Sequence, residues 1–388
     1  MTPRSDTALR RLFHVVNGGT PTSDDRNWGG GIHWATPVDL GRVHGRCLDG
    51  TDRTLSDAGL RSGSAAVPAG SLIVSTRAPI GYVAETTTLT AFNQGCKGLI
   101  PTTPLNTRFY RYVLVSMSSQ LQTAGQGSTF VELSGDALAQ QRVPRRRRAV
   151  QRAIADFLDT ETARIDALIT KKRRMIQLLE EWFVAQRSSL VLRGLHPIHG
   201  EARQPAAQGP WNTVALGVLI VLHRGFDLPV DARELGSVPV VSSGGISGTH
   251  SESMCDPPGI VTGRYGTIGE VFFVAEPFWP LNTTLFVSDF RGNDPRWVYH
   301  LLAALPLDFD AEKSAVTGIN RNVIGALRCP RLPVEEQHKI AKALDACVEH
   351  RDRTVAPLRR QVELLQEHRQ ALITAAVTGE LEVPGVAA

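Results

Sequence analysis

The stretch "QRAIADFLDTETARIDALI" at residues 151–169 returns in altered form as "QHKIAKALDACVEHRDRTV" at residues 337–355. One ungapped offset of 186 residues (337 − 151) relates the two copies, and it pairs Gln151 with Gln337 and Asp159 with Asp345. A period this long exceeds the unit of any solenoid. The sequence therefore predicts a duplicated domain in which each copy ends in a long helix.

In the first copy, once the polar Glu161 and Lys172 are included, the positions of the apolar residues alternate three and four apart, which is typical of a coiled-coil seam, and the second copy has similar spacing. The seams are Ile154, Leu158, Ile165, Leu168, Met175, Leu179 and Phe183 in the first copy, and Ile340, Leu344, Cys347, Val355, Leu358, Val362, Leu365 and Leu372 in the second. Because each seam needs a partner, we expect the two helices to pack on each other in antiparallel fashion, with one globule at each end.

The segments between the helices alternate short β-like runs with Gly, Pro and Asn turns. "STRAPIGYV" (75–83) matches "TGRYGTIGEV" (262–271), which aligns Arg77 with Arg264, and "AFNQG" (91–95) matches "PLNTT" (280–284). The predicted fold class is α+β, with two similar globules, an antiparallel coiled coil and a pseudo-twofold internal repeat. Its expected parts are 1–145 (first globule), 146–200 (central helix), 201–332 (second globule) and 333–388 (C-terminal helix).

Composition narrows the class of protein. The formal net charge is +4, and the five cysteines are widely spaced without a CxxC pair, so neither a disulfide framework nor a zinc site is indicated. The apolar run "VALGVLIVL" (214–222) is far shorter than the roughly 20 residues of a membrane helix. We therefore expect a cytoplasmic protein without membrane contact.

No catalytic motif emerges. "DPPG" (256–259) ends in glycine where an amino-methyltransferase motif carries an aromatic ring, and no glycine-rich cofactor loop accompanies it. A Walker A sequence, a nucleophile elbow and an HExxH pair are also missing from the sequence. The sequence predicts a chain without an active site, bound metal or cofactor.

Two related globules at a fixed separation suit DNA, whose half-sites about 34–36 Å apart require a rigid spacer. The alternative is a coiled-coil structural or adaptor protein that binds no nucleic acid. Geometry leaves both readings open.

Particular sequence motifs distinguish between these two functions better than the geometry does. "NGGTPTSDDRNWGGGIHWATPVDLG" (17–41) resembles the opening of a target recognition domain from the specificity subunits of Type I restriction-modification systems. "HRGFDLPVDARELGSVPVVSSGGISGTH" (223–250) resembles the other common version, and both long helices are similar to the conserved regions of that family. One departure is Val150, which stands where the second copy and the family carry glutamate.

The resemblance implies a non-catalytic subunit that reads a bipartite, asymmetric site in double-stranded DNA. It implies two modification subunits as partners, which bind S-adenosylmethionine and methylate adenine. It also implies restriction or motor subunits that use ATP and Mg and cut DNA.

Base readout requires donors and acceptors on loops. The candidates are Arg77, Asn93, Gln94, Lys97, Gln126, Ser128 and Thr129 in the first globule and Arg264, Tyr265, Asn282, Thr283, Lys313, Thr317, Asn320 and Arg321 in the second. Arg77 and Arg264 are favoured because they align, although a recurring arginine can equally hold a loop together.

A further basic cluster comprises Arg145, Arg146, Arg147 and Arg148, within a segment (142–174) of 11 Lys/Arg and 4 Asp/Glu, hence 11 − 4 = +7. Arginines at a helix N-terminus oppose the helix dipole. Phosphate contact is the hypothesis for this cluster, and a solvated surface is the alternative.

Overall fold

The computed structural model describes residues 6–125, 132–192, 212–265, 267, 269–307 and 321–386, and the backbone of Arg193. Contacts divide the chain into two units. Unit 1 comprises residues 1–172 and 360–388, and unit 2 comprises residues 173–359. Each long helix thus contributes residues to both units, so the units cut across the four parts expected from sequence.

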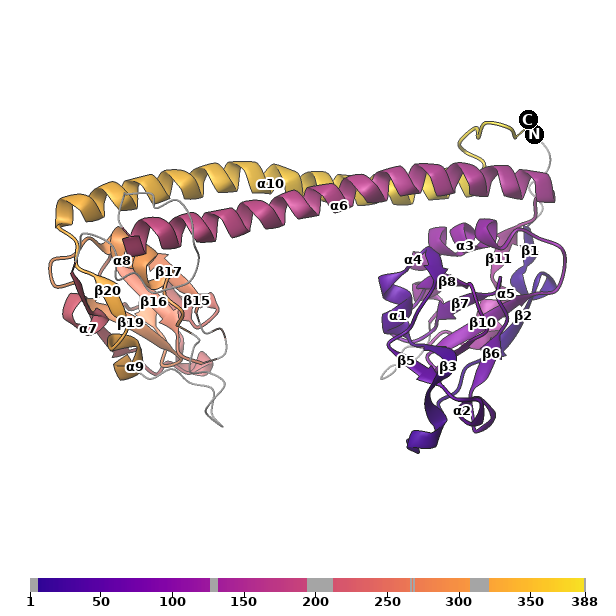
Figure 1. The fold of residues 1–388 in the computed structure, drawn as a ribbon, viewed down its shortest axis with the longest axis horizontal. Helices are drawn as coiled ribbons and strands as arrows, with labels where there is room; N and C mark the ends of the chain where they lie inside the picture. Colours follow the sequence, from indigo (N-terminus) through magenta and orange to yellow (C-terminus); the bar gives the residue numbers. More distant parts are fainter. Residues whose placement is uncertain are drawn as a thin grey trace. The chain divides into compact units, whose positions relative to one another are not determined.

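Unit 1 is built on two mixed sheets (Figure 1). The first has the order β2 (Phe13–Asn17), β10 (Cys96–Pro101), β7 (Leu72–Ser75), β8 (Val83–Thr86), β4 (Arg46–Leu48). The second has the order β5 (Arg53–Leu55), β3 (Trp28–Ala35), β9 (Thr90–Phe92), β6 (Ala65–Val67), and β1 (Asp6–Ala8) pairs with β11 (Arg142–Pro144). The shorter helices are η1 (Leu9–Arg11), η2 (Asp25–Asn27), α1 (Pro37–Arg42), α2 (Asp57–Arg61), α3 (Thr107–Ser116), α4 (Ser118–Thr123) and α5 (Gly135–Gln140).

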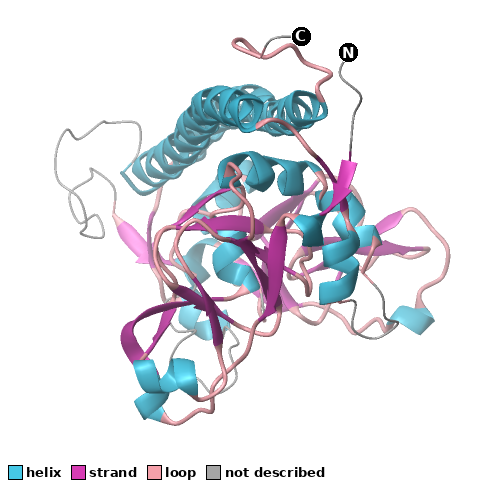
Figure 2. Ribbon diagram, turned by 90° about the vertical axis from the view of Figure 1, so that its right-hand side faces the viewer, coloured by secondary structure: helices cyan, strands magenta, loops and turns pink. Residues whose placement is uncertain are grey.

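Helix α3 lies between the strands of unit 1 and the long helices (Figures 1 and 2). Its apolar residues join β7 and the first turns of α6 (Arg148–Arg193) in one buried cluster that includes Leu72, Val113 and Leu158. Burial of this cluster is the main force that fixes α6 on the globule.

Unit 2 repeats this plan. Its larger sheet has the order β13 (Val221–Arg224), β19 (Thr284–Asp289), β16 (Gly259–Gly263), β17 (Val271–Val274). A second sheet has the order β15 (Gly245–His250), β14 (Val238–Ser242), β18 (Trp279–Pro280), and β12 (Thr213–Ala215) pairs with β20 (Arg328–Pro330). The helices are α7 (Leu216–Leu219), η3 (Val230–Ala232), α8 (Pro295–Leu302), α9 (Arg321–Gly325) and α10 (Val334–Thr378). The predicted α+β class and internal repeat are confirmed.

The repeated glutamines perform one task in both units. Gln151 Oε1 accepts the backbone N–H of Asn106, the N-cap of α3, at 2.8 Å, and Gln151 Nε2 donates to the carbonyl of Arg146 at 2.9 Å. Gln337 makes the same two bonds, with the N–H of Asp294 at 2.8 Å and the carbonyl of Leu332 at 2.9 Å. Each glutamine therefore joins a long helix to the short helix packed beneath it.

The repeated aspartates have a parallel role. Asp159 accepts from Arg111 at 2.9 Å and from the Tyr112 hydroxyl at 2.7 Å. Asp345 accepts from Arg296 at 2.6 Å and from His300 Nε2 at 3.0 Å. These aspartates thus hold α3 and α8 against the long helices.

The long helices pair in antiparallel fashion within each unit. In unit 1, Ile165 and Ile169 pack with Val362, and Arg369 Nε binds Asp166 at 2.9 Å while Lys172 Nζ binds Gln361 at 2.6 Å. In unit 2, Arg359 binds Glu180 at 2.7 Å, and the Arg351 guanidinium lies 4.5 Å from the Phe183 ring centroid. Positions that rise along α6 meet positions that fall along α10, as expected for an antiparallel coiled coil.

The predicted seam is wrong at Leu168 and Met175, whose side chains are exposed. Ile169 takes the buried place instead. The reason is that Ile154 and Leu158 lie in a cluster that the globule of unit 1 shares with Ile373, Ala376 and Val377 of α10, whereas Ile165 and Ile169 pack with Val362 of α10 outside that cluster. A single stripe drawn through all of these positions mixes two different packing faces.

Candidate nucleic-acid interface

Three loops of unit 1 meet at one end of the larger sheet. The Gly18 N–H, just after β2, lies 3.4 Å from the Cys96 carbonyl, and the Gly19 N–H donates to the Phe92 carbonyl at 3.0 Å. The Thr76 N–H, just after β7, donates to the Gly95 carbonyl at 2.8 Å. A Cβ atom on Gly18 would lie 2.0 Å from the Asn93 carbonyl oxygen, so only glycine permits this approach.

Unit 2 builds the same arrangement with different residues. The N–H groups of Gly225 and Phe226 donate to the carbonyls of Thr284 and Pro280 at 3.1 and 2.8 Å. The Arg264 N–H donates to the Thr283 carbonyl at 2.9 Å. The loop that follows β16 is therefore held against the loop that precedes β19, as the corresponding loops are in unit 1.

This bonding corrects the sequence alignment by one residue. Because Ser75 pairs with Cys96 and Gly263 pairs with Thr284, Arg264 is equivalent to Thr76, and Arg77 is equivalent to Tyr265. Likewise Gln94, not Asn93, is equivalent to Asn282. The supposed recurrence of Arg77 at Arg264 is wrong, since the strand register and not the matching letter decides equivalence.

The corrected register reveals a polar pair that sequence reasoning missed. The Thr20 hydroxyl donates to Gln94 Oε1, and in unit 2 the Asn282 amide donates to Asp227 Oδ1. Thr20 and Asp227 stand at equivalent places, two residues after Gly18 and Gly225. The sequence feature that could have identified them is their position two residues after a glycine near the start of each globule.

Glu132 was also missed, and it alters the electrostatics of unit 1. Its carboxylate binds Arg77 Nε at 3.0 Å and lies 3.7 Å from Lys97 Nζ. Lys97 lies inside β10 and is only 8% exposed, so the expected loop setting is wrong for this residue. Asn93 closes its own turn, accepting the Gly95 N–H at 3.1 Å. Arg77 and Gln94 remain as exposed polar groups.

In unit 2 the Arg264 guanidinium carbon lies 4.7 Å from the Tyr265 ring centroid, and both side chains are half-buried. Such stacking fixes the direction of a guanidinium without neutralising it.

The Thr283 hydroxyl is buried and makes no hydrogen bond with any described residue. Arg321, in α9, is exposed and lines a groove of about 620 Å³ with His223 and Arg291.

The basic cluster divides by role. Arg145, Arg147 and Arg148 are exposed, whereas Arg146 is half-buried and lies 3.3 Å from the carbonyl of Thr378 at the end of α10. Six candidates, Gln126, Ser128, Thr129, Lys313, Thr317 and Asn320, lie outside the described residues.

Within the described ranges, His, Cys, Asp and Glu side chains form no group of three that could hold a metal ion. The helices described include none with the length and apolarity needed to cross a membrane.

The family model described as the Type I restriction modification DNA specificity domain matches residues 6–178, which cover the unit 1 globule and the start of α6. This match confirms the resemblance of the chain to the specificity subunits of Type I restriction-modification systems.

Two specificity subunits are similar to this chain. The Type I restriction enzyme MjaIX specificity subunit of Methanocaldococcus jannaschii is 29% identical over 233 residues, which are 57% of this chain and about half (52%) of that protein. The EcoprrI specificity subunit of Escherichia coli is 24% identical over 356 residues, covering 87% of this chain and 86% of that protein.

A solved chain from a structural account of complex assembly and conformational transition of the type I R-M system has the same fold. Its TM-score is 0.73 at 13% identity, with coverage of 98% of this chain and 99% of that chain.

Proposed function

We propose that this chain is a specificity subunit that recognises a bipartite, asymmetric site in double-stranded DNA, with one half-site read by each unit. The observation that carries the proposal is the repeated three-loop arrangement, in which Gly18 and Gly225 bring polar side chains to the same end of each sheet. Loops fixed by backbone bonds position side chains firmly enough to distinguish base edges.

The two loop sets present different chemistry, which favours two different half-sites. Unit 1 carries the neutral pair Thr20 and Gln94, with Arg77 partly offset by Glu132. Unit 2 carries Asp227 with Asn282, and an arginine stacked on Tyr265. Donor and acceptor patterns this different do not suit identical base sequences.

We further propose that catalysis resides on partner subunits. Modification subunits would bind S-adenosylmethionine and methylate adenine, and restriction or motor subunits would use ATP and Mg to cleave DNA in the cytoplasm. In support, Leu178 and Leu364, related by the same offset of 186 residues, are both exposed large apolar side chains (46% and 47%) on the long helices. Exposed apolar residues at matched sites suit one partner helix per unit, hence two modification subunits.

Met175 and Trp182 extend the exposed apolar stripe around Leu178 on α6. Replacing Trp182 with arginine is expected to weaken the docking of a modification subunit and to leave DNA sequence preference unchanged. The adaptor alternative receives no support from the matched relatives.

The test is selection of bound duplexes from a randomised pool, followed by quantitative binding of Arg77→Ala and Arg264→Ala variants in the complex with modification subunits. If an arginine contacts guanine, its loss costs about 1–3 kcal/mol and relaxes one base of one half-site. Equal weakening on all sequences would mean a phosphate contact. Absence of any sequence preference in the wild-type complex would contradict the proposed function.

A further inference from the structure

The two units differ at one edge of their larger sheets. In unit 1 the edge of β8 is covered by β4, which runs parallel to it and pairs Arg46 with Ala84, Cys47 with Glu85 and Leu48 with Thr86. In unit 2 the equivalent strand, β17, is the last of its sheet, and no described residue pairs with its outer edge. An uncovered strand edge leaves backbone donors and acceptors available to another chain.

The sequence accounts for this difference. In unit 1 the chain leaves β3 at Ala35, forms α1 and β4, and returns to pair Arg53 with Trp34. In unit 2 it turns back at once, since Ser242 at the end of β14 pairs with Gly245 at the start of β15. The segment that covers β8 is therefore replaced in unit 2 by a tight turn.

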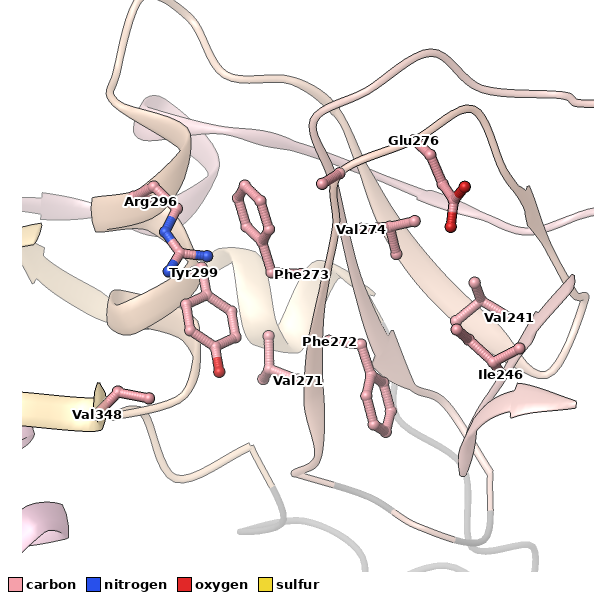
Figure 3. Close-up of a pocket in the computed structure, with 11 residues that line it drawn as sticks. Val241, Ile246, Val271, Phe272, Phe273, Val274, Glu276, Arg296, Tyr299 and Val348 are labelled. Atoms are coloured by element: carbon pink, nitrogen blue, oxygen red, sulfur yellow. The ribbon is translucent and has the colours of Figure 1, made fainter. Parts of the chain in front are cut away.

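A cavity of about 320 Å³ beside β17 is lined by this strand and by residues of β14, β15, α8 and α10 (Figure 3). The strand pairing makes Phe272, Phe273 and Val274 the equivalents of Ala84, Glu85 and Thr86, the residues that β4 covers, and all three line the cavity. Phe273 points toward Arg296 and Tyr299, while Phe272 points toward Ile246 (Figure 3). Side chains from both faces of a strand can line one cavity only around its open edge.

The floor of this cavity has also changed from polar to apolar. In unit 1 the Glu85 carboxylate accepts from Arg111 at 3.0 Å, with the Cys47 sulfur of β4 3.7 Å from the same guanidinium. At the two positions equivalent to Glu85 and Arg111, unit 2 has Phe273 and Tyr299, whose ring centroids lie 5.9 Å apart. A side chain at the place of Cys47 would therefore meet two aromatic rings.

Acidic residues flank strand β17. Glu270 and Glu276, on either side of β17, are both exposed. Two carboxylates repel a phosphate backbone and attract a basic peptide. Ile246, on the neighbouring sheet, exposes 68% of its surface beside the cavity.

We infer that the outer edge of β17 is a docking site for an extended segment of a protein partner, which adds as a parallel strand in the place that β4 occupies in unit 1. The segment carries a basic residue followed by two apolar residues, the first of which enters the recess of Phe273 and Tyr299. Backbone hydrogen bonds to an edge strand supply affinity in such complexes, and a side-chain pocket supplies specificity. This inference does not depend on DNA recognition.

The probe is a fluorescein-labelled peptide that copies residues 42–50 with the change Cys47→Leu, titrated against the full-length chain by fluorescence anisotropy. We expect saturable binding, together with slower amide exchange in residues 271–274. The affinity falls by about tenfold or more in Ile246→Lys and in Glu270→Lys/Glu276→Lys, which add repulsion to a basic peptide. Val230→Lys, at another exposed apolar residue of unit 2 that does not line the cavity, leaves the affinity unchanged.

The variants alter exposed side chains, and unchanged thermal unfolding shows that they fold. The inference is overturned if the folded wild-type chain does not bind the peptide saturably, or if Ile246→Lys binds it as well as the wild type. Displacement of the peptide by duplex DNA would instead show that the outer edge of β17 binds nucleic acid. A concentration-dependent dimer that Ile246→Lys dissociates would assign it to a second copy of this chain.

Discussion

The side-chain oxygen of Gln151 accepts the backbone N–H of Asn106 at 2.8 Å, and this single contact caps one helix from another. Replacing Gln151 with leucine keeps the volume but leaves the N–H group and the Arg146 carbonyl unpaired. We expect a loss of about 1–3 kcal/mol of unfolding free energy. Gln337→Leu is the matched change in unit 2, and chemical denaturation should give a similar loss for both. A loss confined to one variant would contradict equivalent roles for the glutamines.

The two aspartates should differ in cost. Asp159→Ala leaves Arg111, whose side chain is only 5% exposed, with Glu85 as its remaining carboxylate partner and removes the acceptor of the Tyr112 hydroxyl, so we expect a loss of about 1–3 kcal/mol for each of these two groups. Asp345→Ala frees Arg296, which is 40% exposed, and should cost about 1–3 kcal/mol. Burial lowers the pKa of His300 despite its bond to Asp345, so the imidazole is neutral at pH 7. Removing Asp345 therefore leaves no uncompensated charge on His300. Thermal unfolding of both variants measures the order, and a larger loss for Asp345→Ala would oppose this account.

Acid should destabilise unit 1 through His44. Burial, assisted by Arg369 and Arg46, lowers the pKa of His44 from 6.5 to about 4, and its Nδ1 accepts the Val83 N–H at 3.1 Å. Between these pH values the unfolded chain holds a proton that the folded chain lacks. Stability from this group is therefore complete above pH 6.5 and is lost as the pH falls toward 4, by up to about 3 kcal/mol. In denaturation at pH 7 and pH 4.5, His44→Gln should lose less stability than the wild type.

Glu132 should limit electrostatic attraction to DNA in unit 1. Glu132→Gln removes the charge that faces Arg77 and Lys97, so non-specific affinity should rise and the salt dependence should steepen by about one phosphate contact. The matched control is Asp136→Asn, which neutralises an acidic residue of α5 that no ion pair engages among the described residues. Equal salt slopes for Glu132→Gln and the wild type would remove Arg77 from the DNA-contacting set.

The basic cluster permits a separation of binding from folding. Replacing Arg145, Arg147 and Arg148 with serine should reduce the salt slope of DNA binding without a change in unfolding temperature, because all three are exposed. Arg146→Ser should instead reduce stability, since its guanidinium lies against the Thr378 carbonyl. An unchanged slope in the triple variant would support the solvated-surface alternative.

Sequence reasoning found the duplicated helices because Gln151, Asp159 and their copies make the same contacts, so the same residue types are needed twice. It aligned Arg77 with the wrong residue of unit 2 and assigned Lys97 to a loop. Backbone hydrogen bonds between strands decide which residues of the two units are equivalent, and the residue types alone do not reveal these bonds. Lys97 also lies in a strand position where unit 2 has the buried Leu285. Glu132 pairs with residues far away in sequence, and only the folded chain brings them together.

The open edge of β17 shows another limit of sequence reasoning. The sequence contains the short turn after Ser242, but its consequence depends on which strand the missing segment would have covered. Pattern and periodicity identify strands, whereas strand order and edges follow from long-range pairing.

The most direct test of the central claim is a genome-wide map of N6-methyladenine in the source cell, with this gene intact, deleted, or altered at Arg264. The account predicts that one split motif disappears on deletion and that the Arg264→Ala variant relaxes bases in only one half of that motif. An unchanged methylation map after deletion, with a modification subunit expressed, would contradict it.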